Sequence, residues 1–536
     1  MRDTEGNFVY LISCRSVEPN KGETLGELMR RSGSTVTEPC GGRGTCGKCR
    51  VKVEGVVPDC TETERLFLTD EDIEAGIRLA CITPAKKGMV VSRVDEIPRS
   101  MKILSGEKDA VPLYASDKDG RALFSVAIDL GTTTLVAYLV NKSSGAVIAV
   151  SSVVNPQVMF GADIISRISY ASKREDALAV LQNRIVDAVN RLIFNLQRRA
   201  AVSEEEITEV VVSGNTTMEH IFAGVSPTSI GKAPFTPQYR EFPPLTAARM
   251  NMALSPETAV RFLPNISGFV GGDITAGIIY TGMAKSEKLS LLIDIGTNNE
   301  MVLGCKDFLL CCSAAAGPAL EGAKISQGMC ASEGAIDHAK KGLGGICVST
   351  IDNAPAVGIC GSGLVDAITI LLEEGIIDKS GKFAKPSSGE RDLFERLDVE
   401  RKRFLLSKSS KKSVFVTQKD IRELQLAKSA IYTGIEIMLD EAGKELEDIE
   451  RVFLAGAFGN YLNIENAMKV GILPLLPLEK IKSVGNSSGL GAIEFILHSE
   501  RWEEAKEVIS STKHIELATH RGFPLKFVKN LSFYLP

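Results

Sequence analysis

Two hydrophobic runs along this chain each stop at an aspartate. Residues 123–140 (LFSVAIDLGTTTLVAYLV) and residues 289–304 (LSLLIDIGTNNEMVLG) both read as a buried strand, an Asp-x-Gly-Thr turn and a second strand. The two aspartates, Asp129 and Asp294, are 165 residues apart, a period that is too long for a solenoid repeat. The pattern therefore predicts two copies of one domain-sized unit.

Between and after these copies, helical segments alternate with strand-like segments. Residues 172–200 repeat apolar side chains at helical spacing, whereas residues 209–215 (EVVVSGN) read as a buried strand. Such alternation is typical of α/β layers. We predict a duplicated α/β fold, with residues 123–206 as its first subdomain and residues 207–536 as its C-terminal domain. Residues 95–122 are polar and aperiodic, which predicts a linker.

Residues 1–94 contain shorter periodic segments. Residues 8–13 (FVYLIS) and 49–55 (CRVKVEG) have strand character, while residues 23–33 and 61–81 have the charge and apolar spacing of helices. We predict a small α+β domain here, with five strands around one or two helices.

The composition narrows the class of protein. The 536 residues exceed what one hydrophobic core supports, and the hydrophobic (44%) and charged (24%) fractions are those of ordinary globular proteins. The net charge is −5 without a basic stripe, which argues against a nucleic-acid partner. Charged residues interrupt each apolar run before it reaches about 18 residues, and no signal-peptide pattern is visible. We expect a cytoplasmic protein without a membrane segment.

Twelve cysteines fall into two groups, six within the first 81 residues and six from Cys305 to Cys360. Clustered cysteines in a cytosolic chain favour metal or redox chemistry over disulfides. The second group has no CxxC spacing and lies among apolar or small residues. We predict that its members are core thiols.

The loop CGGRGTCGKC brings Cys40, Cys46 and Cys49 close together, and Cys81 follows 32 residues later. Thiolates bind iron and zinc strongly, and a loop rich in glycine lets several sulfurs converge. Three cysteines in a loop with one distant cysteine is the arrangement of 2Fe-2S ferredoxins, and the five-residue first gap resembles the adrenodoxin type. We assign these four cysteines as ligands. Amides freed by the loop glycines are expected to donate hydrogen bonds to the sulfurs, and these glycines are Gly41, Gly42, Gly44 and Gly47.

Two alternatives stay open for this loop. A zinc site also uses three or four cysteines, although zinc ribbons usually pair two CxxC knuckles and only one, Cys46 to Cys49, is present. Cys60 competes with Cys81 for the fourth ligand position, and we favour Cys81 because its wide spacing matches ferredoxins. Cys14 and Cys60 are then expected to be inert core thiols.

Each Asp-x-Gly-Thr turn has the chemistry of a phosphate-binding hairpin. Glycine allows close approach of the backbone, threonine offers an amide and a hydroxyl, and aspartate can hold Mg²⁺ through water. Two such hairpins can grip the β- and γ-phosphates of ATP from opposite sides. Asp129 and Asp294 are assigned to Mg²⁺ and catalysis. The residues assigned to phosphate are Gly131, Thr132, Thr133, Gly296, Thr297 and Asn298.

Two further glycine motifs follow. Residues 357–368 (VGICGSGLVDAI) resemble a connecting-helix motif, where small residues let two helices cross closely, and residues 452–462 (VFLAGAFGNYL) resemble a loop that lies against adenosine. Each glycine motif taken alone is better explained by tight packing of a helix or turn than by nucleotide binding. With the hairpins, the set resembles the superfamily of acetate and sugar kinases, heat-shock chaperones and actin (ASKHA), whereas the sequence has no Walker lysine loop. The nucleotide positions assigned here are Gly361, Ser362, Gly363, Gly456, Ala457, Phe458 and Gly459.

Asp273, in VGGDITAG, is the third catalytic candidate. It either orients water or binds Mg²⁺, or else it caps the following helix, where a carboxylate is stabilising. Glu300 lies either on a surface strand or at the phosphate site. His220 and the other four histidines have no companions at ligand spacing, so we expect structural roles for them.

An N-terminal cysteine loop joined to these nucleotide motifs resembles the reductive activators of corrinoid proteins. The resemblance runs through PCGGRGTCGKCRV, AIDLGTTT, SGNTTM, VGGDITAG, DIGTN, SAAAGPALEGA, GICGSGLVDA and LAGAFGNYL. It implies a β-grasp 2Fe-2S ferredoxin-like domain followed by a duplicated ASKHA-type, ribonuclease H-like ATPase fold. One departure is Asn299, where the family generally has glycine.

The resemblance also implies a function, namely ATP-dependent reduction of inactive Co(II) to Co(I) on a corrinoid protein of a methyltransferase system. The implied cofactors are a 2Fe-2S cluster, ATP and Mg²⁺. The implied partners are the corrinoid protein and a low-potential electron donor, and the sequence leaves a homodimer open. Two other functions fit the motifs: a small-molecule kinase with a regulatory iron–sulfur domain, and an activator of a radical dehydratase.

Overall fold

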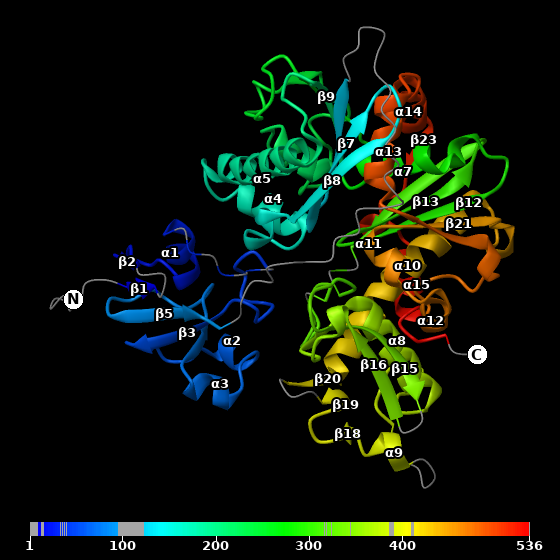
Figure 1. Cartoon of the computed structure of the whole chain (residues 1–536). Coiled ribbons are helices and arrows are strands. Elements are labelled where there is room, and N and C mark those ends of the chain that lie inside the picture. The colour runs from blue at the N-terminus through cyan, green and yellow to red at the C-terminus, as the bar shows by residue number, and fades with distance from the viewer. Residues whose placement is uncertain are drawn as a thin grey trace. The chain divides into compact units, whose positions relative to one another are not determined.

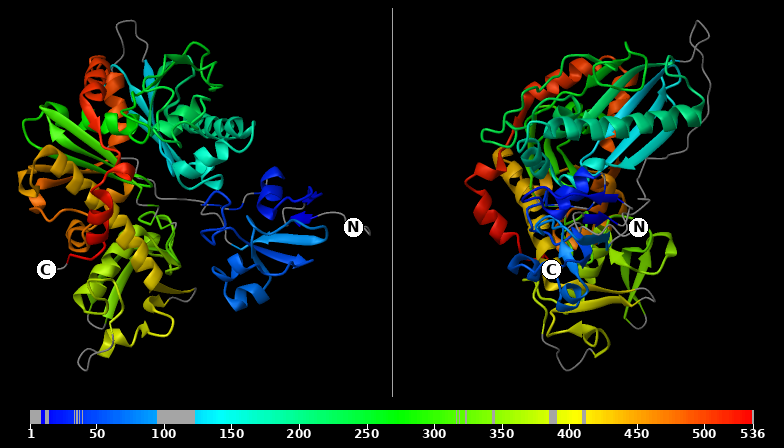
Figure 2. Two further views of the ribbon diagram at one scale, coloured as in Figure 1. Left: turned by 180° about the vertical axis from the view of Figure 1, so that it is seen from behind. Right: turned by 90° about the vertical axis from the view of Figure 1, so that its left-hand side faces the viewer.

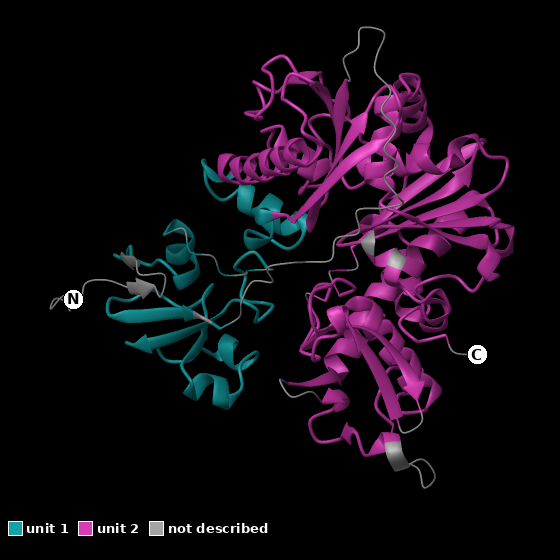
Figure 3. Cartoon of the chain, viewed as in Figure 1, with its two compact units in different colours: residues 1–99, 156–177 teal, residues 100–155, 178–536 magenta. Residues whose placement is uncertain are grey.

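The chain forms two compact units, which Figure 3 shows in teal and magenta. Unit 1 comprises residues 1–99 and 156–177, and unit 2 comprises residues 100–155 and 178–536. The expected linker at residues 95–122 and Cys14 lie outside the described part of the chain. The computed structural model describes residues 9–11, 15–32, 34, 36, 38, 40–94, 123–315, 317, 319–322, 324–342, 345–384, 391–408 and 412–534.

Unit 1 contains a five-stranded sheet in the order β2-β1-β5-β3-β4, in which only the β1–β5 pair is parallel. The predicted five strands are therefore present, and Leu28, Val51 and Leu79 lie in the buried core beneath them. The strands are β1 (Val9–Leu11), β2 (Arg15–Val17), β3 (Arg50–Gly55), β4 (Ile77–Leu79) and β5 (Met89–Arg93).

Each helix of this sheet domain begins with its own capping box. Thr24, Thr61 and Thr69 each accept a hydrogen bond from the backbone three residues on, and the acidic residue there bonds back to the cap. Residues 61–81, expected as one helical segment, instead form two helices, because Thr69 starts a new one, and then strand β4. The three helices are α1 (Leu25–Arg31), α2 (Glu62–Arg65) and α3 (Asp70–Glu74).

The rest of unit 1 is a 3₁₀ turn at Pro156–Met159 and helix α4 (Ile164–Ala171), which Asp163 caps. The Arg167 side chain is fully buried, and it donates hydrogen bonds to the Gly161 carbonyl and to Gln157 Oε1. A buried guanidinium that has acceptors on both sides fixes the path of this segment.

Unit 2 begins with a six-stranded sheet in the order β10-β11-β9-β6-β7-β8 (Figure 1). β9 pairs in parallel with both β6 and β11, so the expected boundary between residues 206 and 207 differs from the structure, which keeps β9 within the first sheet. The elements are β6 (Phe124–Leu130), β7 (Thr134–Asn141), β8 (Val147–Val154), α5 (Ala177–Ala200), β9 (Ile207–Gly214), α6 (Thr216–Phe222), β10 (Leu245–Thr246) and β11 (Ala259–Phe262).

A second six-stranded sheet has the order β22-β21-β12-β13-β14-β23. Its central strand β12 pairs antiparallel with β13 and parallel with β21, as β6 does with β7 and β9, and this matching topology confirms the predicted duplication. The strands are β12 (Ser290–Ile295), β13 (Asn299–Cys305), β14 (Phe308–Ala314), β21 (Arg451–Ala455), β22 (Ile481–Gly485) and β23 (Thr512–His514).

Between β14 and β21 the chain builds two three-stranded sheets, ordered β16-β15-β17 and β18-β19-β20, with α8 and α10 alongside. These elements are β15 (Ala335–Gly342), β16 (Gly345–Thr350), β17 (Gly358–Ile359), α8 (Gly361–Glu373), α9 (Arg391–Phe394), β18 (Leu397–Asp398), β19 (Arg403–Lys408), β20 (Ser413–Thr417) and α10 (Gln418–Ala442). The remaining helices are α7 (Gly272–Thr281), α11 (Ala457–Tyr461), α12 (Ile464–Val470), α13 (Ser487–Leu497), α14 (Arg501–Ser511) and α15 (Phe523–Lys529).

Helices α7 and α13 lie between the two six-stranded sheets, where they share one hydrophobic core with strands of both (Figures 1 and 2). They cross closely, because a Cβ at Gly491 would lie 2.5 Å from the Ala276 carbonyl oxygen. The close helix crossing expected at residues 357–368 is therefore found elsewhere. The α8 glycines instead approach backbone outside helices: a Cβ at Gly361 would lie 1.8 Å from the Leu320 oxygen, and one at Gly363 2.3 Å from the Ile336 oxygen.

Across the described residues, every helix is too short or too polar to span a bilayer.

Candidate functional site

The cysteine loop of unit 1 brings the four predicted ligands together. Cys49 Sγ lies 3.2 Å from Cys81 Sγ, and the Cys40 thiol contacts those of Cys46 and Cys81. Cys40, Cys49 and Cys81 are buried and Cys46 is half-buried. Cys60 is also half-buried rather than in the core, and its Sγ contacts the Thr61 carbonyl at 3.6 Å.

Glycines set the shape of this loop. Gly42, Gly44 and Gly47 have φ of 80°, 71° and 66°, a region that side-chain-bearing residues rarely adopt. A Cβ at Gly47 would lie 2.6 Å from Cβ of Phe67, so that position has no room for a side chain.

Each of these three glycines turns the amide of the next residue towards a sulfur. The N–H groups of Arg43 and Thr45 donate to Cys40 Sγ, and that of Lys48 donates to Cys46 Sγ. The expected amide donors are therefore the residues after the glycines. The Cys46 and Cys81 thiols, followed by these amides, lower the pKa of Cys40, which favours the thiolate that a metal requires. Four converging thiols with amide donors around them fit a thiolate-bound 2Fe-2S cluster.

The second site is a cavity in unit 2 where the two predicted hairpins meet. Asp129 ends β6, Asp294 ends β12, and both line the cavity. Of the remaining sequence-predicted residues, Gly363 and Gly459 lie outside the described lining, and the Ala457 side chain is not among the described residues. The predicted residues that do line it are Asp129, Gly131, Thr132, Thr133, Asp273, Asp294, Gly296, Thr297, Asn298, Gly361, Ser362, Gly456 and Phe458.

Carboxylates dominate the hairpin end of this cavity, which has no lysine or arginine among its described lining residues. Burial raises the pKa of Asp129 to about 6. Burial and the charge of Asp129 raise that of Asp294 to about 7, and burial and the charge of Asp294 raise that of Asp273 to about 8. Burial also holds the pKa of Glu300, opposite Asp294 on β13, well above its usual range. This oxygen-rich, anionic set suits a hard divalent cation.

Three residues hold these groups in place, and of these the sequence analysis pointed only to Asn215, in the SGNTTM motif. Asp129 accepts hydrogen bonds from Ser488 Oγ (2.8 Å) and Asn486 Nδ2 (2.9 Å), both at the start of α13. Asn215, the N-cap of α6, donates from Nδ2 to Thr132 Oγ1 at 2.9 Å. Asn215 and Asn486 each stand directly before a helix, which is also the signal of an ordinary helix cap, and Ser488 lies in the first turn of α13.

The N-cap of α7 is Gly271, so Asp273 does not cap this helix, and its assignment to water or Mg²⁺ stays a prediction. It lies in the first turn of α7, where its Oδ1 accepts a hydrogen bond from the Ile274 amide at 2.8 Å, and it also lines the cavity. His220 is fully buried, with Nδ1 2.7 Å from the Thr216 carbonyl oxygen and Nε2 accepting from the Tyr239 amide. These contacts are structural.

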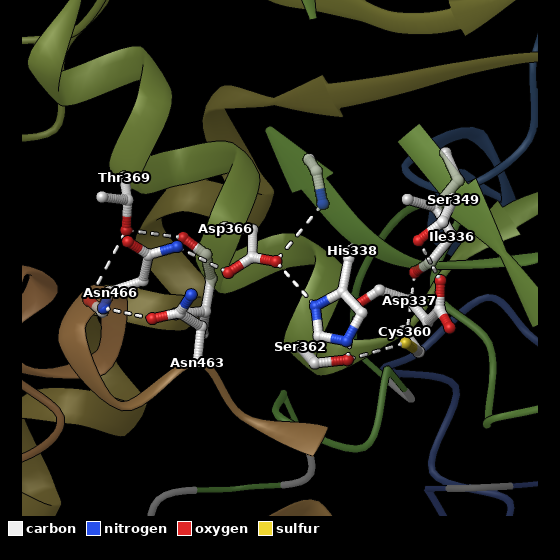
Figure 4. Close-up of polar contacts among 12 residues, drawn as sticks. Ile336, Asp337, His338, Ser349, Cys360, Ser362, Asp366, Thr369, Asn463 and Asn466 are labelled. Atoms are coloured by element: carbon white, nitrogen blue, oxygen red, sulfur yellow. Dashed lines mark hydrogen bonds and ion pairs between the residues drawn. The ribbon is translucent and has the colours of Figure 1, made fainter. Parts of the chain in front are cut away.

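The other end of the cavity is more apolar and lies beside α8 (Figure 4). Met329, Ile351 and Phe458 line it, as does Asp337 at a β-bulge in β15. Ser362 Oγ donates to the Asp337 carbonyl oxygen at 2.8 Å. An apolar wall with a few polar groups suits the nucleoside of a nucleotide.

Figure 4 also shows a hydrogen-bond network centred on the buried side chain of Asp366. Asp366 accepts hydrogen bonds from Asn466 Nδ2 at 2.7 Å and pairs with His338 Nδ1 at 3.0 Å. Three cysteines differ from the expected core role: Cys347 is exposed, Cys330 is half-buried and lines the cavity, and Cys360 is buried but also lines the cavity.

Comparison with known proteins agrees with this division of the chain. A family model described as a 2Fe-2S iron–sulfur cluster binding domain matches residues 13–86. Models described as the RACo middle region and the C-terminal domain of RACo, the ASKHA domain, match residues 124–286 and 288–535. The predicted ferredoxin-like and ASKHA fold classes are confirmed.

Individual relatives cover most of the chain. The corrinoid activation enzyme RamQ of Eubacterium limosum is 35% identical over 439 residues, which is 80% of this chain and 74% of that protein. The Co(II) methylated amine-specific corrinoid protein reductase of Methanosarcina barkeri is 30% identical over 295 residues, 51% of each chain. The solved structure of a reductive activator for corrinoid, iron–sulfur protein is 31% identical, covers 98% of both chains and has a TM-score of 0.69. The chain therefore belongs to the family of reductive activators of corrinoid proteins.

Proposed function

We propose that this protein uses ATP to drive single electrons from a low-potential donor, through a 2Fe-2S cluster, onto the Co(II) centre of a corrinoid protein. The observation that carries the proposal is the presence, in one chain, of four converging thiols and a two-hairpin nucleotide cavity. The family membership supports it. We place the activity in the cytoplasm, where thiols stay reduced.

Cys40, Cys46, Cys49 and Cys81 would hold the cluster, which supplies one-electron transfer when bound. The protein contributes the amides of Arg43, Thr45 and Lys48, because hydrogen bonds to sulfur shift the potential of such a centre.

Asp129 and Asp294 would hold Mg²⁺, and the cation would supply the positive charge that the cavity lining lacks. Thr132, Thr133 and Thr297 offer hydroxyls and amides to the phosphates. Ser488 and Asn486 keep the Asp129 carboxylate oriented towards the cavity. Gly456 and Phe458 would contact the nucleoside.

Nucleotide binding must change the energetics of electron transfer for this machinery to work. Reduction of Co(II) to Co(I) is uphill for an ordinary 2Fe-2S centre, and for a one-electron step each ~59 mV changes the equilibrium constant tenfold. ATP can offset this only if the ATP-bound and ADP-bound forms differ in affinity for the corrinoid partner.

ATP turnover with and without a Co(II) corrinoid protein tests the proposal. The expected result is release of ADP and phosphate that the corrinoid protein stimulates at least tenfold. Transfer of the phosphoryl group to a small molecule, independent of corrinoid protein, would instead support the alternative kinase function. A 2Fe-2S spectrum that is lost on Cys46→Ser excludes the dehydratase activators, which usually hold a 4Fe-4S cluster between subunits.

A further inference from the structure

Glu321 lies where the two phosphate hairpins meet. Its Oε1 and Oε2 are 2.9 Å and 2.8 Å from Thr297 Oγ1, and its Oε2 is 3.1 Å from Thr133 Oγ1. The two threonine hydroxyls are themselves 3.0 Å apart. One carboxylate thus bridges a hydroxyl from each half of the duplicated fold.

A close-packed turn holds Glu321 in this place. Gly322, the next residue, has a φ of 79°, and a Cβ there would lie 2.7 Å from the Met329 carbonyl oxygen. The Gly322 amide donates to the Ala319 carbonyl at 3.0 Å, and Ala319 and Leu320 are buried. The backbone on both sides of Glu321 therefore packs against fixed neighbours.

The position that Glu321 occupies is one that a phosphate oxygen would also take. Carboxylate and phosphate oxygens both accept hydrogen bonds from threonine hydroxyls, and each hydroxyl has one hydrogen to give. A terminal phosphate bound between the hairpins would take the hydrogens of Thr133 and Thr297. The Glu321 carboxylate would then lie beside that phosphate with acceptor positions turned towards a water molecule.

The other carboxylates around the hairpins are less suited to accept a proton from water. Asp129 is held by Ser488 and Asn486. Asp273 accepts a hydrogen bond from the Ile274 amide at 2.8 Å in the first turn of α7. Glu300 is buried opposite Asp294 on β13.

We propose that Glu321 is the catalytic base of ATP hydrolysis, which orients the attacking water and takes its proton. This inference rests on the proposed ATPase function. An O–H bond of water breaks and its proton goes to the Glu321 carboxylate, while the water oxygen bonds to the terminal phosphorus. The bond from that phosphorus to the bridging oxygen breaks, and ADP leaves with the electron pair. The proton then passes to solvent.

The test is Glu321→Gln in the full-length, cluster-loaded protein, assayed for ATP turnover with a Co(II) corrinoid protein. We expect kcat to fall about 100-fold to 1000-fold, the range for loss of a general base. Binding of MgATP, measured by calorimetry, should be as tight as in wild type or tighter, because a negative charge next to the phosphates is removed. The acidic limb that Glu321 contributes to the wild-type pH–kcat profile, measured at saturating MgATP, should be absent from the variant.

Two further variants make the result decisive. Glu333→Gln changes an exposed glutamate twelve residues away and should leave turnover unchanged. Glu321→Asp keeps the carboxylate and should recover part of the lost kcat. Turnover of Glu321→Gln within threefold of wild type, or loss of MgATP binding in step with turnover, overturns the role of Glu321 as the base. A wild-type protein that neither binds nor hydrolyses ATP would instead contradict the proposed function itself.

Discussion

The cysteine loop and the nucleotide cavity are built in opposite ways. Three of the four predicted cluster ligands lie within ten residues, from Cys40 to Cys49, and glycines shape the loop between them. The lining of the cavity runs from Asp129 to Ser488, so it exists only once both sheets and helices α7 and α13 have packed. A local site depends on backbone conformation, whereas an assembled site depends on the packing of distant elements.

The two sites also differ in the polar groups that surround their charged side chains. The loop surrounds its sulfurs with backbone N–H donors, which favour thiolates. The cavity gathers carboxylates without a lysine or arginine among its described lining residues, and burial raises the pKa of several of them. Backbone donors therefore stabilise charge on Cys40 and Cys46 in the first site, whereas the second gathers carboxylates that a bound cation would stabilise.

The largest expected effect comes from a variant that should disable the cysteine loop and leave the nucleotide cavity intact. Cys46→Ser removes one thiolate, so the visible absorbance and iron content of anaerobically purified protein should drop, and corrinoid reduction should fall at least 1000-fold. Binding of MgATP should be unchanged, because the cavity shares no residue with the loop. Cys60→Ser is the matched control. It should keep the cluster, because the Cys60 sulfur contacts the Thr61 carbonyl.

The next effect tests whether backbone conformation governs the loop. Gly47→Ala places a methyl group 2.6 Å from Phe67 Cβ and also forces a positive φ, and we expect it to destabilise unit 1 by about 2–5 kcal/mol. Gly22→Ala imposes a similar φ of 79° but has no atom within 4 Å, so it should cost about 1–2 kcal/mol. Thermal unfolding of the cluster-loaded proteins measures the difference, and equal losses would show that steric packing at Phe67 is unimportant.

The pH dependence tests the charge of the cavity. The folded-state pKa values of Asp129, Asp294 and Asp273 (about 6, 7 and 8) lie above that of a free aspartic acid, so the unfolded chain releases these protons first. Without ligand, the free energy of unfolding should therefore decrease as pH rises from about 4 to 8. MgATP favours the ionised carboxylates, so its affinity should rise about tenfold or more between pH 6 and 8.

Calorimetric titrations and thermal melts at pH 6, 7 and 8 measure both trends. Asp129→Asn should make both the free energy of unfolding and the affinity for MgATP change less with pH, because it removes one of the three titrating groups. An affinity for MgATP that does not change over this range would contradict the account of the cavity.

The smallest effect concerns the residue that departs from the family pattern. Asn299 is fully buried on β13, and neither its Oδ1 nor its Nδ2 has a hydrogen-bond partner among the described residues. Asn299→Ala should therefore raise the free energy of unfolding by about 1 kcal/mol in urea titrations. Asn298→Ala, one residue earlier but on the cavity wall, should weaken MgATP binding instead. A loss of stability on Asn299→Ala would show that the side-chain amide of Asn299 has hydrogen-bond partners in solution.

The sequence predicted the parts of this molecule that are encoded locally. The cysteine spacing indicated the loop, and the repeated Asp-x-Gly-Thr turns indicated the duplicated sheets and both hairpins. Glu321, Ser488 and Asn486 could not be found in this way, because single Glu, Ser and Asn residues occur on any surface or helix cap. Only the packing of α13 and of the β14–β15 connection brings them to the hairpins.

The dependence on long-range packing also explains why the structure differs from two predictions, the subdomain boundary and the place of the close helix crossing. The first sheet continues to β11 because β9 inserts between β6 and β11, a long-range pairing that periodicity does not reveal. The small residues that allow helices to cross belong to α7 and α13, whereas the glycines of α8 approach backbone oxygens of Leu320 and Ile336.

The most direct test of the account is a single-turnover experiment under anaerobic conditions. The reduced, cluster-loaded protein is mixed with a Co(II) corrinoid protein, and formation of Co(I) is followed by visible absorbance with MgATP, with MgADP and without nucleotide. The account predicts that Co(I) accumulates only with MgATP and that oxidation of the cluster accompanies it. Equal Co(I) formation under all three conditions, or none with any corrinoid protein tested, would contradict the coupling of the two sites.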